Sequence, residues 1–134
     1  MADAVTSQVL CESAGYITML FTNRSDGTGE ADVKKVDVSA MTPACTTVVV
    51  EKIIYAVSGC ELIMEWDATT DVPFCVLGGP GAGVSGEIDA SQFGGIHNNA
   101  AAANLTGDIF FTFTAAIADA GDSYTVILHM RKVI

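Results

Sequence analysis

Apolar and polar residues alternate most clearly in the middle of the chain, and this pattern predicts β-strands. Across residues 60–66 every second side chain is apolar, while Glu61 and Glu65 fall on the other side, which is the period of a half-buried strand. Residues 48–57 form a run rich in β-branched side chains, and a Ser-Gly dipeptide at 58–59 separates the two runs. Together they predict a central hairpin with one strongly apolar face.

Strand-like alternation elsewhere predicts six more strands. They are expected at residues 15–23, 30–38, 74–77, 85–89, 109–114 and 121–130. About eight short strands with polar turns between them, and no convincing amphipathic helix, are typical of an all-β sandwich or barrel. Alternation on both faces favours antiparallel pairing. We therefore expect an antiparallel β-sandwich with a jelly-roll-like arrangement.

The length of 134 residues suits one domain with a sizeable core of its own. Residues 1–14 lack a clear period, so we expect an N-terminal arm that docks late, followed by a single sandwich domain over 15–134. Within that domain, residues 78–106 are rich in glycine and alanine, and seven of the 13 glycines fall between 78 and 95. The composition predicts a long loop, and such loops usually have a function or a partner.

Charge and hydropathy restrict the classes of partner. Sixteen acidic residues against six basic ones give a net charge of −10, which repels phosphate backbones and anionic lipid head groups. Nucleic acid and membrane are therefore not expected as partners, and no apolar run reaches the roughly 18 residues that span a bilayer. The first ten residues lack the basic and apolar regions of a signal peptide, so we expect synthesis in a cytoplasm. The hydrophobic fraction of 50% is high and suggests apolar surface that a partner buries.

The four cysteines stand apart from one another, without a CxxC pair or a histidine at zinc-finger spacing. They are Cys11, Cys45, Cys60 and Cys75. We expect reduced thiols in or near the core, with two disulfides as the alternative.

Several motifs suggest chemistry, but their context does not support it. The spacing GxGxxG occurs at 81–86, yet no helix follows to receive a pyrophosphate, so a loop is favoured over a dinucleotide site. Glu61 and Glu65 would lie roughly 13 Å apart along a strand, too far for a glycosidase pair. His97 and His129 have no neighbouring nucleophile in the sequence. A surface histidine and a strand histidine are the simpler interpretations.

Acidic residues near turns could supply oxygen ligands to calcium, but none forms the DxDxDG loop that makes such a site specific. They are Asp67, Asp71, Asp119 and Asp122, and turn capping is the favoured role for them. Trp66 could stack on a sugar, but its place in the apolar series of its strand favours burial in the core. We therefore predict no catalytic residue, no cofactor and no metal.

The segment at 50–77, followed by FGGIHNNA, TGDIFFTF and AGDSYTVILHMRK, resembles a group of small structural proteins of tailed-bacteriophage heads. The likeness spans most of 50–132 and is carried by the order of EWDATTD, FGG, TGDI and GDSYTVIL. It implies a jelly-roll-like virion protein, a capsid decoration or cement protein that clamps neighbouring subunits of the major capsid protein. Self-association, as a homotrimer, is expected with it.

The residues fit that role independently, since a net charge of −10 suits the outside of a capsid better than the DNA-filled interior. We predict that the arm and the uncharged loop make the contacts, through Val5, Val9, Phe93, Ile96, His97, Asn98 and Asn99. One alternative is a recognition module of the same fold, such as a phage fibre or carbohydrate-binding domain, which would need an exposed aromatic platform. A cupin-type enzyme is a third, but two histidines without HxH spacing leave its metal site incomplete.

Overall fold

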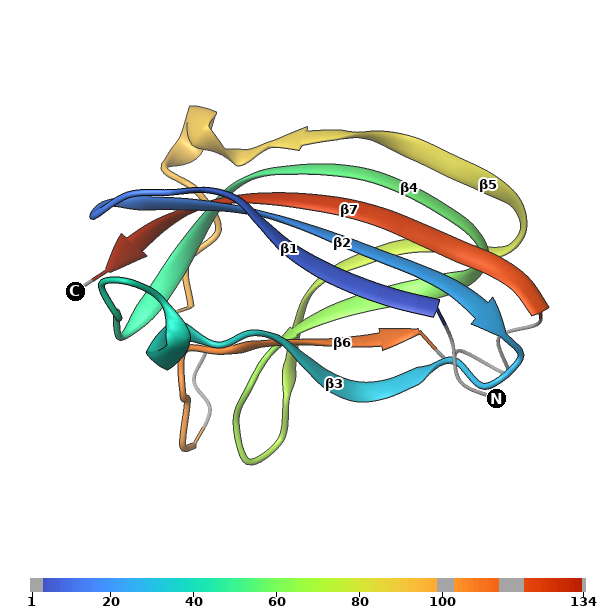
Figure 1. Cartoon of the computed structure of the whole chain (residues 1–134), viewed down its shortest axis with the longest axis horizontal. Helices are drawn as coiled ribbons and strands as arrows, with labels where there is room; N and C mark the ends of the chain where they lie inside the picture. The colour runs from blue at the N-terminus through green and yellow to red at the C-terminus, as the bar shows by residue number, and fades with distance from the viewer. Residues whose placement is uncertain (1–3, 99–102, 114–119, 134) are drawn as a thin grey trace.

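Antiparallel β-strands make up most of residues 4–98, 103–113 and 120–133, the part of the chain that the computed structural model describes (Figure 1). The strands are β1 (Ala4–Glu12), β2 (Tyr16–Asp26), β3 (Glu30–Val36), β4 (Thr47–Trp66), β5 (Val72–Asp89), β6 (Ile109–Phe113) and β7 (Ala120–Val133). Every pairing between them is antiparallel. The predicted fold, an all-β antiparallel sandwich of jelly-roll-like form, is confirmed.

Two layers arise because β4 and β5 each run from one layer into the other. The first layer has the order β1-β2-β7, followed by residues 47–58 of β4 and 84–89 of β5. The second has the order β3-β6, followed by residues 61–66 of β4 and 72–78 of β5. Figure 1 shows β3 and β6 lying below the longer strands of the first layer. The first layer therefore contains five strand segments and the second contains four.

The predicted hairpin across Ser58-Gly59 is wrong, because β4 continues through this dipeptide. Gly59 has a φ of +87°, and the pairing register with β5 shifts on both sides of it. A glycine at positive φ within a strand is typical of a β-bulge that bends the strand. Asp122 lies against Gly59 and occupies the space that a β-carbon would need. The dipeptide is therefore the point where β4 passes between the layers.

The predicted loop over 78–106 is also wrong in its first part. β5 extends to Asp89 and pairs with β4 from Val72–Trp66 to Asp89–Lys52. The GxGxxG spacing at 81–86 therefore lies within a strand, and the two short strands predicted at 74–77 and 85–89 are one. Glycine lacks the side chain that usually gives a strand its packing, and pairing with β4 from Lys52 to Trp66 replaces that support.

Aromatic side chains from both layers meet in the core. Phe111 packs edge to face against Phe21 at 5.1 Å and against Tyr124 at 5.8 Å, and Phe113 packs against Tyr124 at 5.0 Å. Such pairs contribute about 0.5–1.5 kcal/mol each beyond the area they bury. Trp66 is buried, as predicted. These contacts join β2 and β7 of the first layer to β6 of the second.

Helical structure is limited, among the described residues, to two single turns. They are η1 (Val38–Ala40) and η2 (Ala90–Phe93), and each begins after an aspartate that accepts a hydrogen bond from the backbone. No helix in these ranges has the length and apolar content that crossing a membrane requires.

Candidate functional site

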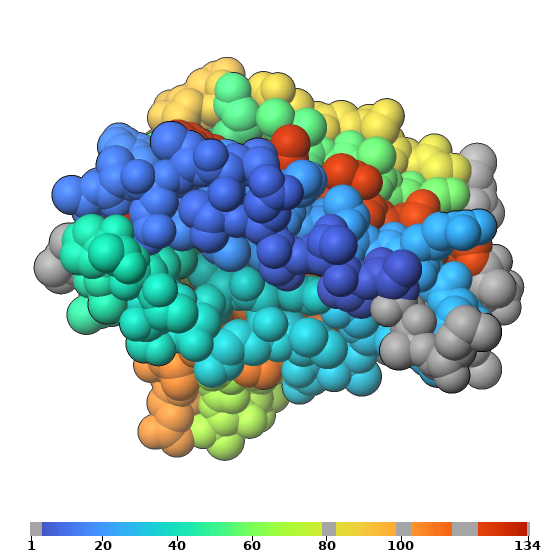
Figure 2. All heavy atoms as spheres, in the orientation of Figure 1, coloured from blue at the N-terminus to red at the C-terminus, as the bar shows by residue number. Residues whose placement is uncertain are grey.

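The predicted N-terminal arm contains strand β1, which pairs along its length with β2. All nine residues of β1 are exposed. Val5, Val9 and Leu10 are apolar members with exposed fractions of 39%, 46% and 46%. Figure 2 shows β1, in dark blue, lying across the face of the molecule that is turned toward the viewer. Two of the predicted interface residues, Val5 and Val9, are therefore on an exposed strand.

β1 is exposed because the first layer is one strand wider than the second. Starting from β4 and β5, which both layers share, the first layer continues through β7 and β2 to β1, while the second ends at β3. β1 therefore extends beyond the last strand that could lie opposite it. Among the described residues, no other strand pairs with its outer edge.

The second group of predicted interface residues follows η2. Phe93 is 70% exposed and His97 is exposed, with its Nε2 atom 3.1 Å from a backbone carbonyl oxygen. Ile96 is half-buried and forms a β-bridge with Val50, and Asn98 is also half-buried. Asn99 lies outside the described residues. We refer to Phe93 and His97 as the η2 corner.

The two groups do not form one patch. β1 is the last strand on one side of the first layer, whereas η2 follows β5, the last segment on the other side. In Figure 1, η2 lies at the top and β1 crosses the front of the molecule. The predicted interface therefore consists of two separate surfaces.

A groove runs between β1 and the segment around η1. Its volume is about 220 Å³, and the apolar residues Val9, Ile17, Met19 and Met41 contribute to its lining. If the core continued beneath β1, its side chains would fill this space. The second layer ends at β3, before it reaches β1, and the inner face of β1 is therefore left accessible.

A buried lysine fixes the C-terminal end of β1. The Lys132 side chain is fully buried and donates hydrogen bonds to Glu12 Oε2 at 2.9 Å and to the carbonyl oxygens of Thr42 and Pro43 at 3.1 Å. The hydrogen bond from Lys132, with another from the Thr42 backbone N–H, lowers the pKa of the Glu12 carboxyl. β1 is thereby held to β7 and to the chain after η1, although its own side chains are exposed.

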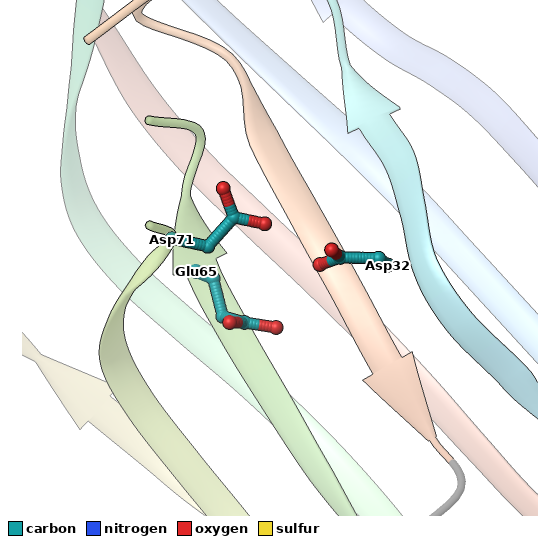
Figure 3. A group of neighbouring side chains, drawn as sticks. All are labelled: Asp32, Glu65 and Asp71. Carbon is teal, nitrogen blue, oxygen red and sulfur yellow. The ribbon is translucent and has the colours of Figure 1, made fainter. Parts of the chain in front are cut away.

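A cluster of carboxylates forms a second feature, an open pocket in the second layer. Asp32, Glu65 and Asp71 have carboxylate oxygens within 4.8 Å of one another (Figure 3), and the pocket volume is about 470 Å³. A hydrogen bond with Asp71 is the largest cause that raises the pKa of Asp32 to about 6, followed by burial and repulsion from the surrounding carboxylates. Thr112 donates to Glu65 at 2.8 Å and accepts from the Asp32 N–H at 3.2 Å. The threonine positions two of the three acids.

Oxygen ligands of this kind suit Ca²⁺ or Mg²⁺, and the same acids can instead share a proton. Sequence reasoning considered Asp71 for a cation but missed Asp32 and Glu65, which come from different strands. Asp67 lines the pocket and accepts a hydrogen bond from Thr106 at 2.6 Å. Of the other acids considered, Asp122 lies beside the bulge in β4 and Asp119 is outside the described residues.

His129 lies on the outer face of the first layer rather than in a cleft. Its Nδ1 atom shares a hydrogen bond of 2.8 Å with Thr18 Oγ1, and its Nε2 atom is 4.0 Å from Glu51 Oε1. The ring stacks on Tyr16 at 5.5 Å. A hydroxyl, an imidazole and a carboxylate are the parts of a catalytic triad, but 4.0 Å exceeds a hydrogen bond. The arrangement is that of a surface network between neighbouring strands.

The sequence matches no known protein family and no curated protein. Among solved structures, a cupin superfamily protein from Desulfitobacterium hafniense is similar, with 13% identity, a TM-score of 0.33, and coverage of 100% of this chain and 82% of that one. At this TM-score and identity the likeness carries no inference about function.

Proposed function

We propose that this chain is a structural protein of a bacteriophage head, a decoration or cement protein that binds the outer capsid surface and bridges subunits of the major capsid protein. Its action is adhesive: it forms contacts between proteins and transforms no substrate. The resemblance of residues 50–132 to small head proteins is one support, and the geometry of the exposed surfaces is the other.

The observation that carries the proposal is that exposed apolar side chains lie on two separate surfaces of one small sandwich. A bridging protein must engage two neighbours at once, and two adhesive surfaces on different sides of one domain meet that need. The β1 edge offers an unpaired strand with Val5, Val9 and Leu10, and strand edges readily accept further strands. The η2 corner offers Phe93, a large aromatic side chain that can fill a pocket on a partner.

Charge supports a position outside the capsid. The net charge of −10 would be repelled by packaged DNA. Neither adhesive surface carries much of that charge: residues 4–11 contain no charged side chain, and residues 90–98 contain none apart from a histidine. Contacts there would therefore desolvate few ionised groups.

Capsids that lack this protein provide the test. The purified chain should bind them saturably, with a fixed number of copies per particle. F93A should weaken binding by about tenfold or more, as expected for an aromatic anchor at the centre of an interface. V76A is the matched control, because Val76 is 55% exposed but lies on β5 in the second layer. Absence of saturable binding by the unmodified chain would overturn the proposal.

Carbohydrate recognition is the second candidate, and the pair Tyr16–His129 favours it. The two rings are stacked nearly parallel, with an interplanar angle of 7°, and Tyr16 is 43% exposed. Arg131 and Glu51 form an ion pair of 3.5 Å beside them and could bond to sugar hydroxyls. A glycan array separates the candidates, since a recognition module binds a defined glycan and loses that binding in Y16A. A decoration protein binds capsids whether or not Tyr16 is present.

A further inference from the structure

We propose that the outer edge of β1 pairs with β1 of a second copy of this chain, antiparallel and about a two-fold axis at Ser7. The pairing joins the first layers of two molecules into one continuous sheet. It goes beyond the proposed function, because it concerns how two free copies meet and does not require a capsid.

As far as Val9, the edge of β1 lacks the features that normally prevent strand pairing, since the one shift in its register with β2 lies between Val9 and Cys11. Exposed edges are usually blunted by lysine, proline, a short strand, a β-bulge or a covering segment. β1 has nine residues, about 30 Å of extended chain, and Ala4–Cys11 includes no proline and no charged residue. Its single acid, Glu12, is bound by Lys132. Within the described part of the chain, nothing covers this edge.

The uncharged edge favours a second copy over a charged partner strand. Two molecules of net charge −10 repel each other over most of their surfaces. An uncharged edge is where two copies can approach with the least opposition, and at physiological salt the remaining repulsion is screened beyond about 8 Å. A strongly basic partner would instead find no complementary charge on residues 4–11.

The side-chain pattern of β1 is self-complementary about Ser7. Val5 pairs with Asn23, Ser7 with Phe21 and Val9 with Met19. Since Phe21 points into the core and side chains alternate along a strand, Val5, Ser7 and Val9 share the inner face of β1.

In an antiparallel pair centred on Ser7, each Val5 faces the Val9 of the other copy on the inner face. On the outer face each Thr6 faces a Gln8, and each Ala4 faces a Leu10. A β-branched pair and a polar pair are both favourable, at about 0.2–1 kcal/mol per pair. The four valines would gather on the inner face, where the second layer ends before β1. The part of β1 that its own domain leaves exposed would thus gain neighbours.

This arrangement differs from the homotrimer expected from the sequence. A closed trimer needs a head-to-tail contact, in which β1 meets a different surface of the next copy. The two-fold pairing is isologous, so the same strand serves both partners. It buries the two β1 edges against each other, so the dimer would meet neighbouring capsid subunits through its two η2 corners.

Disulfide trapping tests the register. Opposite residues in an antiparallel pair have β-carbons about 4.5–5.5 Å apart, close to disulfide geometry. S7C should therefore form a covalent dimer under mild oxidation. The natural Cys11 is exposed and serves as the control. In this register the two copies of Cys11 lie eight positions apart, about 27 Å, so the unmodified chain should not cross-link.

Charge reversal tests the contact itself. V5K/V9K places lysines opposite each other twice, and V5E/V9E does the same with glutamates. Each variant alone should dimerise at least about tenfold more weakly, and an equimolar mixture should form heterodimers. V76K/V84K is the control, because Val76 and Val84 are exposed on β5 away from β1, and its dimer should persist.

Sedimentation analysis of the 134-residue chain gives the oligomeric state. Three results together support the proposal. S7C traps a covalent dimer, V5K/V9K and V5E/V9E each lose the dimer when alone, and their equimolar mixture restores it. A monomer at about 100 μM or a trimer would overturn it, as would a dimer that S7C fails to trap. Failure of capsid binding with the dimer intact would count against the proposed function alone.

Discussion

Replacement of the buried Lys35 by methionine should strongly destabilise the sandwich. Lys35 Nζ lies 2.5 Å from Glu30 Oε2, and the two side chains are only 3% and 6% exposed. The other carboxylate oxygen of Glu30 accepts hydrogen bonds from Asn23 at 2.6 Å and Tyr124 at 2.5 Å. K35M removes the cation that pairs with Glu30 and leaves the buried carboxylate with its hydrogen bonds from Asn23 and Tyr124. Breaking a buried pair in this way costs about 3–5 kcal/mol.

Urea unfolding, followed by the fluorescence of Trp66, measures the loss in the free energy of unfolding. With a slope of about 2 kcal/mol per molar urea, a cost of about 3 kcal/mol lowers the midpoint by about 1.5 M. E30Q/K35M should recover much of it, because glutamine keeps an acceptor for Asn23 and Tyr124 without a buried charge. K52M is the surface control, and it should change the midpoint little, since Lys52 and its partner Glu87 are 39% and 49% exposed. A midpoint for K35M within about 0.3 M of the unmodified chain would show that the buried Lys35–Glu30 pair does not hold the fold together in this way.

Two further substitutions test the turn before β6 and the acidic pocket. G107A should lower the free energy of unfolding by about 2 kcal/mol or more, because Gly107 has a φ of +89° and a β-carbon there would lie 2.0 Å from the Thr46 carbonyl oxygen. G15A, where a β-carbon meets nothing within 4 Å, should have little effect in the same urea titration. D32N should flatten the dependence of stability on pH. The raised pKa of about 6 against an ordinary 3.8 means that Asp32 favours the folded state fully below about pH 4, and this contribution is lost as pH rises through 6. Between about pH 4 and 6 the urea midpoint should fall less in D32N than in the unmodified chain. An equal fall in both proteins would contradict the raised pKa of Asp32.

Alternation along the chain predicted the strands that have one buried and one exposed face. In β7, Tyr124, Val126, Leu128 and Met130 are buried, and the sequence places them at every second position. Where the chain bends, the same reasoning failed. Ser58-Gly59 has the composition of a turn, but Gly59 forms a bulge inside β4. Local composition does not distinguish a glycine that reverses a chain from one that only bends it.

Pairing between distant segments accounts for the other differences. The glycine-rich half of β5 has no apolar pattern of its own and is a strand because it pairs with β4. β1 has apolar residues on both faces, so its period is unclear, and its place beside β2 fixes its structure. In the acidic pocket, Asp32 and Glu65 lie 33 positions apart in the sequence and meet only because β6 pairs with both β3 and β4. No short motif could have indicated that cluster.

Cryo-electron microscopy of capsids saturated with this protein is the sharpest test of binding to the outer capsid surface. Ordered density is expected on that surface, with each sandwich touching the major capsid protein through the η2 corner and spanning more than one of its subunits. Density inside the shell, or capsids that remain bare at saturating concentration, would contradict it.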